Sequence, residues 1–359
     1  MSAVDPRRTL DTRARIALPL CAVLLLGLAT HRLFLAEPAQ RPYVEFSGLT
    51  MGTSYSVKVA DEGLTPDSIA AIQAEIDKRL EHVNALMSTY RDDSELSRFN
   101  AHVSTAPFAL SPQSAEVFRI ANEVSALSGG AFDVTVRPLV AAWGFGDTEH
   151  PLEPPSTEER AALSTRIGYR KLALDLVHST LAKSNPHVEC DLSAIAKGFG
   201  VDEVVRGLVA LGHTSLLVEV GGELRGQGRK LDGLAWRVGI ERPDSQTRTS
   251  HEILDLEDLS LATSGDYRDY YEVNGERISH TIDPRVGAPI RHNLASVSVL
   301  HKQAVWADAL ATALNVLGPD AGLRLADEQG IAALFLVREG DGSFRTIASE
   351  AFLEFHANP

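Results

Sequence analysis

The stretch Trp306-Ala307-Asp308-Ala309-Leu310-Ala311-Thr312 predicts the first turns of a helix, and the rest of the chain is interpreted outward from it. Asp308 and Thr312 are four residues apart, so a helix places them one above the other on the same face. A carboxylate oxygen and a hydroxyl oxygen suit a Mg²⁺ ion that keeps open positions for phosphate oxygens. The alternative is an acidic residue near a helix N-terminus and a threonine bonded back to a carbonyl. The other motifs must decide between the two.

The segments next to this helix alternate between strand and helix patterns. Residues 295–300 predict the strand that enters it, and Gly318-Pro319 predicts its end. Residues 320–328 then predict a short helix, residues 332–337 a strand, and Gly340-Asp341-Gly342 a turn into a final strand.

The N-terminal part of the body is also mixed. Residues 43–60 predict two strands joined at Met51-Gly52-Thr53, and Thr65-Pro66 and Ser111-Pro112 are cap-and-proline helix starts. Further along we expect an extended segment at 131–136, a mobile aromatic loop at 143–146, a helix at 193–211, and strands within 260–283 with a hairpin turn at Asn274-Gly275. Helices and strands without strict alternation favour an α+β fold.

Composition limits the possible partners. The chain has 359 residues, 44% apolar and 23% charged, with a net charge of −14, which is ordinary globular composition. An acidic body argues against a nucleic-acid partner, which needs a basic face. Cys21 and Cys190 are the two cysteines, so no disulfide framework is possible, and Cys190 is expected to be a buried small hydrophobe.

The N-terminus has the order of an export signal. Arg7, Arg8, Arg13 and Arg15 precede an apolar run over residues 16–28, as in a secretory signal peptide or signal anchor. Small residues allow cleavage after Ala29, but apolar residues resume at 33–36, so cleavage and anchoring both stay open. We assign residues 1–36 to this signal or anchor, 37–45 to a linker and 46–356 to the main domain. The domain is then expected on the periplasmic side of the inner membrane, with the basic end in the cytoplasm.

Four further stretches interrupt apolar patterns with glycine and polar residues. They are Met51-Gly52-Thr53, Gly130-Ala131-Phe132-Asp133, the run 191–198 (DLSAIAKG) and the run 279–284 (SHTIDP). No Walker loop is present, and residues 221–228 do not fit G-x-G-x-x-G, so a Rossmann dinucleotide site is not expected. Together with the Asp308–Thr312 helix, these stretches resemble the motif set of the FAD:protein FMN transferase (ApbE) family. The resemblance runs from about Phe46 to Val337.

This resemblance implies a fold and a reaction. The fold would be α+β, ApbE-like and T-fold-like, with FAD in a central cleft. Members of the family transfer the FMN half of FAD onto a Thr or Ser hydroxyl of a target protein, through a phosphoester bond, and AMP leaves. Mg²⁺ is required. Such phosphoryl chemistry depends mainly on positioning and charge neutralisation.

The resemblance also assigns site residues. The metal ligands would be the side chains of Asp308 and Thr312 and the backbone carbonyl of Ala194. FAD contacts would come from Met51, Tyr90, Ala131, Phe132, Asp133, Asp191, Lys197 and Ile282. Five of these have plain structural alternatives: Met51 and Tyr90 as ordinary packing, Phe132 as a core residue, Lys197 as a solvated helix residue, and Asp191 as a helix N-cap.

His280 is the candidate general base, because histidine commonly fills that role near neutral pH. It would take the proton of the acceptor hydroxyl, and Asp283 would orient or charge-balance it. Two other functions stay open: an FAD pyrophosphatase that gives FMN and AMP, and a flavin-binding protein without turnover. The expected acceptor is an exported protein, such as a flavin-bearing subunit of a membrane redox complex.

Overall fold

A computed structural model describes residues 43–146, 153–243, 250–265, 270–273 and 276–357. The predicted signal and most of the predicted linker, and the Asn274-Gly275 turn, lie outside these residues. Within the described ranges, no helix is long and apolar enough to cross a membrane.

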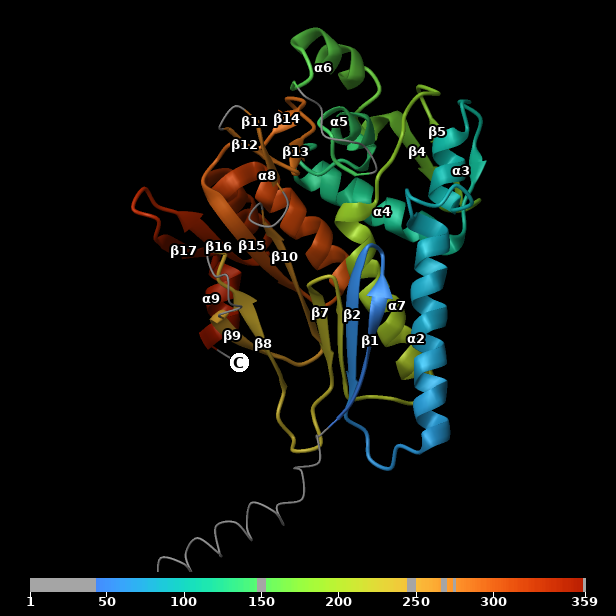
Figure 1. The fold of residues 1–359 in the computed structure, drawn as a ribbon, viewed down its shortest axis with the longest axis vertical. Coiled ribbons are helices and arrows are strands. Elements are labelled where there is room, and N and C mark those ends of the chain that lie inside the picture. Colours follow the sequence, from blue (N-terminus) through green and yellow to red (C-terminus); the bar gives the residue numbers. More distant parts are fainter. Residues whose placement is uncertain (1–42, 147–152, 244–249, 266–269, 274–275, 358–359) are drawn as a thin grey trace, which may run out of the picture. The chain divides into compact units, whose positions relative to one another are not determined.

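The largest element of the fold is an eight-stranded antiparallel sheet (Figure 1). Its strands, in spatial order, are β1 (Val44–Thr50), β2 (Thr53–Val59), β6 (Leu216–Val220), β7 (Glu223–Gln227), β10 (Leu259–Gly265), β15 (Leu294–His301), β16 (Ala332–Arg338) and β17 (Phe344–Ala348).

Both faces of this sheet are covered by other elements. Neighbouring residues of a strand point to opposite faces, so two adjacent residues of β10 show what packs on each face. On β10, Ala262 packs into a cluster with helices α4 (Pro112–Leu127), α7 (Ser193–Ala210) and α8 (Ala304–Gln329). Its neighbour Leu261 packs into a second cluster with the hairpin β8 (Trp236–Glu241) and β9 (Ser250–Leu256) and with helix α9 (Glu350–Ala357). Helix α2 (Pro66–Met87) packs with α7 on β1, β2 and β6.

Shorter elements complete the chain. They are α3 (Glu95–Ala101), β3 (Phe108–Ala109), η1 (Val134–Val136), α5 (Arg137–Ala142), α6 (Thr157–Ser164), η2 (Tyr169–Lys171), β4 (Leu172–Asp175), β5 (Thr180–Lys183), β11 (Tyr270–Val273), β12 (Glu276–Ser279), β13 (Ile282–Asp283) and β14 (Ala288–Pro289). The mixture of helix and antiparallel sheet confirms the predicted α+β class.

Local sequence signals identified the starts of α2 and α4. The Thr65 hydroxyl accepts a hydrogen bond from the Ser68 backbone N–H at 3.2 Å, and Ser111 caps α4 through the Ser114 N–H at 3.2 Å. The predicted helix at Trp306 is α8. As predicted, its first helical segment ends at Gly318, which adopts the non-helical angles φ 77° and ψ −179°, and a second helical segment follows across this kink.

Two predictions for the middle of the chain are wrong. Residues 131–136 are not extended: Asp133 caps the 3₁₀ turn η1, and α5 follows directly. The aromatic loop at 143–146 is held in place, since Trp143 and Phe145 are buried and the Trp143 indole N–H donates to the Gly287 carbonyl at 3.1 Å. Both segments bind residues distant in sequence: the Asp133 carboxylate accepts from the Tyr169 N–H, and the Trp143 indole donates to Gly287.

Helices α7 and α8 cross in close, antiparallel contact. Gly198 of α7 faces Ala304 and Asp308 of α8, and Asp202, one turn further along α7, lies at the start of α8. A Cβ atom at Gly198 would lie 2.2 Å from the Ala304 carbonyl oxygen and 2.8 Å from the Asp308 Cβ. The two backbones can therefore approach this closely only with glycine at this position.

Gly198→Ala is expected to lower the free energy of unfolding by about 1–3 kcal/mol, as overpacking against backbone does. Gly200→Ala on the same helix is the matched control, because its added methyl closely approaches the flexible end of Met51, 2.9 Å away, and otherwise meets the Leu80 side chain at an ordinary 3.9 Å. Chemical denaturation of both variants measures the difference. Equal stability of the two would contradict the described helix contact.

Candidate active site

A cleft of about 750 Å³ gathers most of the residues predicted from sequence. Its walls come from α7, α8, β13, the loop before η1 and the β1–β2 turn. All the predicted site residues line it except Met51 and Asp283; those that do are Tyr90, Ala131, Phe132, Asp133, Asp191, Ala194, Lys197, His280, Ile282, Asp308 and Thr312.

The most polar part of the cleft lies where α7, α8 and β7 meet. Asp308 is 4% exposed, and its carboxylate accepts hydrogen bonds from the Gly198 N–H at 2.9 Å and the Lys197 Nζ at 3.4 Å. The same Nζ donates to Glu223 Oε1 at 2.7 Å. Lys197 is thus an ion-paired residue shared by two carboxylates, not a solvated helix lysine.

Burial and neighbouring charge act in opposition on this group of three. Burial disfavours the Lys197 ammonium, but Asp308 and Glu223 outweigh it and raise the Lys197 pKa above its ordinary value. Burial raises the pKa of the Glu223 carboxyl to about 7; Lys197 opposes this shift and the Asp308 charge reinforces it. The Lys197 ammonium therefore stays charged at neutral pH.

Glu223 was not among the residues predicted from sequence. It is 3% exposed, lines the cleft, and also accepts from the Thr263 N–H at 3.3 Å. An available signal was the Gly221-Gly222-Glu223 run, which places an acidic residue directly after a buried strand and a glycine turn. Its partner Lys197 lies on another element, so the pairing itself could not be predicted.

The balance of charge in the cleft bears on whether the site fits a metal ion. The lining includes four acidic residues: Asp133, Asp191, Glu223 and Asp308. Among the described lining residues, Lys197 is the single Lys or Arg. A diphosphate entering this lining would need a further cation. The carboxylate, hydroxyl and carbonyl oxygens of Asp308, Thr312 and Ala194 are of the type that Mg²⁺ prefers, so the residues present fit that ion.

The same oxygens make a sparse ligand set. In the described part of the chain, no group of three or more His, Cys, Asp or Glu side chains is arranged to hold a metal ion. A Mg²⁺ ion here would therefore depend on one carboxylate, neutral oxygens, water and substrate phosphates, as is common for Mg²⁺ at phosphate sites.

Two lining carboxylates have structural partners of their own. Asp191 accepts from the Ser193 N–H at 2.8 Å at the start of α7, so it supports the helix start and lines the cleft at once. Asp133 accepts from the Thr135 N–H at 2.8 Å and the Tyr169 N–H at 2.7 Å. Burial raises the Asp133 pKa, and these hydrogen bonds oppose the shift.

Met51 and Asp283 lie differently from the sequence-based expectation. Met51 adopts φ 49° in the turn, and its side chain packs against α7 beside Gly200, while Gly52 and Thr53 line the cleft. The Asp283 carboxylate accepts from the Arg285 backbone N–H at 2.9 Å and its guanidinium at 2.7 Å. Asp283 thus holds a turn.

His280 lies at the cleft with aromatic neighbours. Its ring centroid is 6.4 Å from that of Phe145, edge to face, and Phe145 in turn packs on Tyr271 at 5.1 Å. The Tyr271 hydroxyl donates to the Trp143 carbonyl at 2.7 Å. The aromatic loop therefore forms the wall behind His280. Tyr90, 70% exposed, lines the cleft as well.

Comparison with known proteins agrees with this architecture. A model described as the ApbE family matches residues 51–335. A relative from Vibrio cholerae, named FAD:protein FMN transferase, is 45% identical over 319 residues, which cover 89% of this chain and 94% of the relative. One of the same name from Escherichia coli (strain K12) is 35% identical over 346 residues, covering 95% and 97%.

Solved structures give the same result. The flavin transferase ApbE from Vibrio cholerae has a TM-score of 0.80 and 44% identity, with coverage of 87% of this chain and 99% of that one. The apo form of the Pseudomonas stutzeri flavinyl transferase ApbE has a TM-score of 0.80 and 40% identity, covering 90% and 99%. Fold and cleft therefore define an enzyme of the transferase class. The chain belongs to the ApbE family.

Proposed function

We propose that this chain transfers the FMN half of FAD to a Thr or Ser hydroxyl of an exported acceptor protein and releases AMP. The observation that supports it most is that Asp308, Thr312, Lys197 and His280, which come from three segments of the chain, line one cleft. The names of the relatives supply the substrate and the transferred group.

Lys197 and the residues around it would receive the diphosphate. Its ammonium is already held at the cleft by Glu223 and Asp308, so it can pair with phosphate oxygens without a large loss of side-chain entropy. Asp308, Thr312 and the Ala194 carbonyl would hold Mg²⁺. When bound, that ion would neutralise charge on the phosphates and orient them.

His280 would act as general base in the displacement. The acceptor hydroxyl loses its proton to His280 as its oxygen bonds to the phosphorus on the riboflavin side of the diphosphate. The bond from that phosphorus to the bridging oxygen breaks, and AMP leaves with that oxygen. Phe145 packs edge to face on the His280 ring and shields that side of it from water, which would favour a protein hydroxyl over hydrolysis.

The acceptor and the location follow from the N-terminal segment. Arginines before an apolar run in residues 1–36 support export, with this domain on the periplasmic side of the inner membrane and the segment either cleaved or kept as an anchor. The acceptor would then be an extracytoplasmic protein, such as a subunit of a membrane redox complex.

Incubation of the protein with FAD, MgCl₂ and detergent-solubilised membranes of the same organism tests the proposal. We expect a protein band that keeps flavin fluorescence after denaturation, and mass spectrometry should place FMN on a Thr or Ser of it, with AMP released in equal amount. Omission of MgCl₂ or addition of EDTA should abolish the label. Free FMN and AMP with unmodified proteins would indicate a pyrophosphatase, and intact FAD would contradict turnover.

A further inference from the structure

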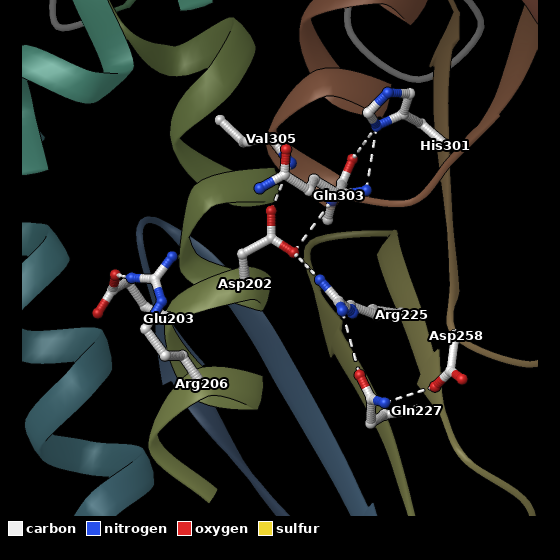
Figure 2. Close-up of polar contacts among 10 residues, drawn as sticks. Asp202, Glu203, Arg206, Arg225, Gln227, Asp258, His301, Gln303 and Val305 are labelled. Atoms are coloured by element: carbon white, nitrogen blue, oxygen red, sulfur yellow. Dashed lines mark hydrogen bonds and ion pairs between the residues drawn. The ribbon is translucent and has the colours of Figure 1, made fainter. Parts of the chain in front are cut away.

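A buried carboxylate outside the cleft connects the two helices that carry the proposed metal ligands. Asp202 on α7 is 5% exposed and accepts hydrogen bonds from the backbone N–H groups of Ala304 at 3.1 Å and Val305 at 3.0 Å (Figure 2). These are the first two residues of α8, whose N-cap residue Gln303 makes no side-chain capping bond. Asp202 therefore caps α8 from another helix.

This cap belongs to a series of positions, spaced one helical turn apart, at which the antiparallel helices α7 and α8 face each other. Asp202 meets Ala304, and Gly198, one turn earlier on α7, donates its N–H to Asp308, one turn later on α8. The next turn in the same direction brings Ala194 and Thr312, both of which line the cleft. Along this one helix contact, Asp308 thus lies one turn from the cap, and Ala194 and Thr312 lie two turns from it.

Strand β7 of the main sheet binds α7 at two points along this contact between α7 and α8. Glu223 and Arg225 are two residues apart and so point to the same face. Glu223 binds Lys197 of α7, and the Arg225 guanidinium donates to Asp202 Oδ1 at 2.8 Å. Figure 2 shows Arg225 also donating to Gln227, at 3.1 Å. Two ion pairs, one at each end of a single stretch of α7, therefore fix β7, α7 and α8 against one another.

We propose that Asp202 is a positioning residue that sets the register of α8 against α7, so that the oxygens of Asp308, Thr312 and Ala194 converge on one Mg²⁺ ion. This inference rests on the proposed function. Asp202→Asn keeps one acceptor oxygen and replaces the other with an NH₂ donor, so Ala304 and Val305 can no longer each have a separate carboxylate oxygen as acceptor, and the Arg225 guanidinium loses its counter-charge. The first turn of α8 is then held less firmly. Asp308 begins the next turn, and Mg²⁺ tolerates little departure from octahedral geometry.

Glu203 offers a matched control. It is the next residue of α7, is 1% exposed, and its carboxylate also binds two guanidinium groups, those of Arg79 at 3.1 Å and of Arg206. Arg79 belongs to α2, so Glu203 joins α7 to α2 and not to α8. Asp202→Asn and Glu203→Gln therefore each remove one negative charge from a buried position, and the two positions are adjacent in α7. Only Asp202→Asn changes a residue that contacts α8.

The experiment is a calorimetric titration with MgCl₂ of the full chain saturated with FAD in the absence of acceptor, so that the diphosphate oxygens are present, supported by the MgCl₂ dependence of the thermal unfolding temperature under the same conditions. We expect Asp202→Asn to weaken Mg²⁺ binding by about 10- to 100-fold, as loss of residues that orient metal ligands does. Glu203→Gln should bind Mg²⁺ as the unmodified protein does. Equal Mg²⁺ affinity in Asp202→Asn and Glu203→Gln would overturn the positioning role.

Failure of the proposed metal site itself would look different, since the unmodified protein would then show no Mg²⁺ binding. Arg225→Gln keeps the Asp202 cap but removes its counter-charge, and its side chain is 20% exposed. Should Asp202→Asn not fold, weaker Mg²⁺ binding by Arg225→Gln would support the proposal, and unchanged binding would contradict it.

Discussion

Asp308→Asn is expected to lower the rate of FMN transfer by about 10³-fold or more, because a metal ion contributes several kcal/mol to such a transition state. Under the proposed function Asp308 provides the anionic ligand of the Mg²⁺ ion, and an amide oxygen is a far weaker ligand than a carboxylate. The measurement is single-turnover FMN transfer at saturating FAD over a range of MgCl₂ concentrations.

Asparagine is a sharper test than alanine at this position. The Asp308 carboxylate also accepts from the buried Gly198 N–H at 2.9 Å. Alanine would leave that N–H without its acceptor, at about 1–3 kcal/mol of stability, whereas the asparagine carbonyl can keep the hydrogen bond. Asp320→Asn, at an exposed position of the same helix, is the control and should transfer FMN normally. Near-normal activity in Asp308→Asn would remove Asp308 from the metal site.

The parts of the fold that could be predicted are those that local chemistry decides. The Thr65-Pro66 and Ser111-Pro112 starts depend on a hydroxyl and a proline within one helical turn, and both helices begin there. The Met51-Gly52 turn likewise depends on two adjacent positive φ angles. Such signals act within a few residues, so a sequence carries them completely.

The predictions of local structure that are wrong concern segments whose conformation depends on residues distant in sequence. Glycine on both sides of Phe145 predicted mobility, but the Trp143 indole is held by Gly287, 144 residues away. Helix α9 was not predicted, because its buried residue Phe352 packs into a cluster formed by β16 and by strands distant in sequence, among them β8 and β9.

The candidate site divides in the same way. A motif could nominate Lys197 and Asp308, because each is a charged residue that interrupts a largely apolar run. It could not nominate Glu223, whose role depends on its ion pair with Lys197. Nor could it nominate Asp202, whose role depends on its hydrogen bond to the start of α8. Residues that contact a ligand are thus easier to predict than the residues that hold them in place.

His280→Ala is expected to slow the chemical step by about 10²- to 10⁴-fold, the usual contribution of a general base, and to leave FAD bound. The imidazole is needed when the acceptor oxygen attacks, not when FAD enters. Rapid-quench measurement of AMP release, beside calorimetric titration with FAD, separates the two effects. Asp283→Asn is the companion variant: because that carboxylate binds Arg285, its transfer rate should change little.

A second readout distinguishes a base from a packing residue. If His280 takes the proton, the variant should lose the part of the pH–rate profile that comes from imidazole ionisation, and added imidazole should restore some transfer. Phe145→Leu removes the ring that packs on His280 at 6.4 Å and should lower the rate while keeping the shape of that profile. Loss of FAD affinity equal to the loss of rate in His280→Ala would instead make His280 a residue that binds FAD, and the proton would have to leave by another route.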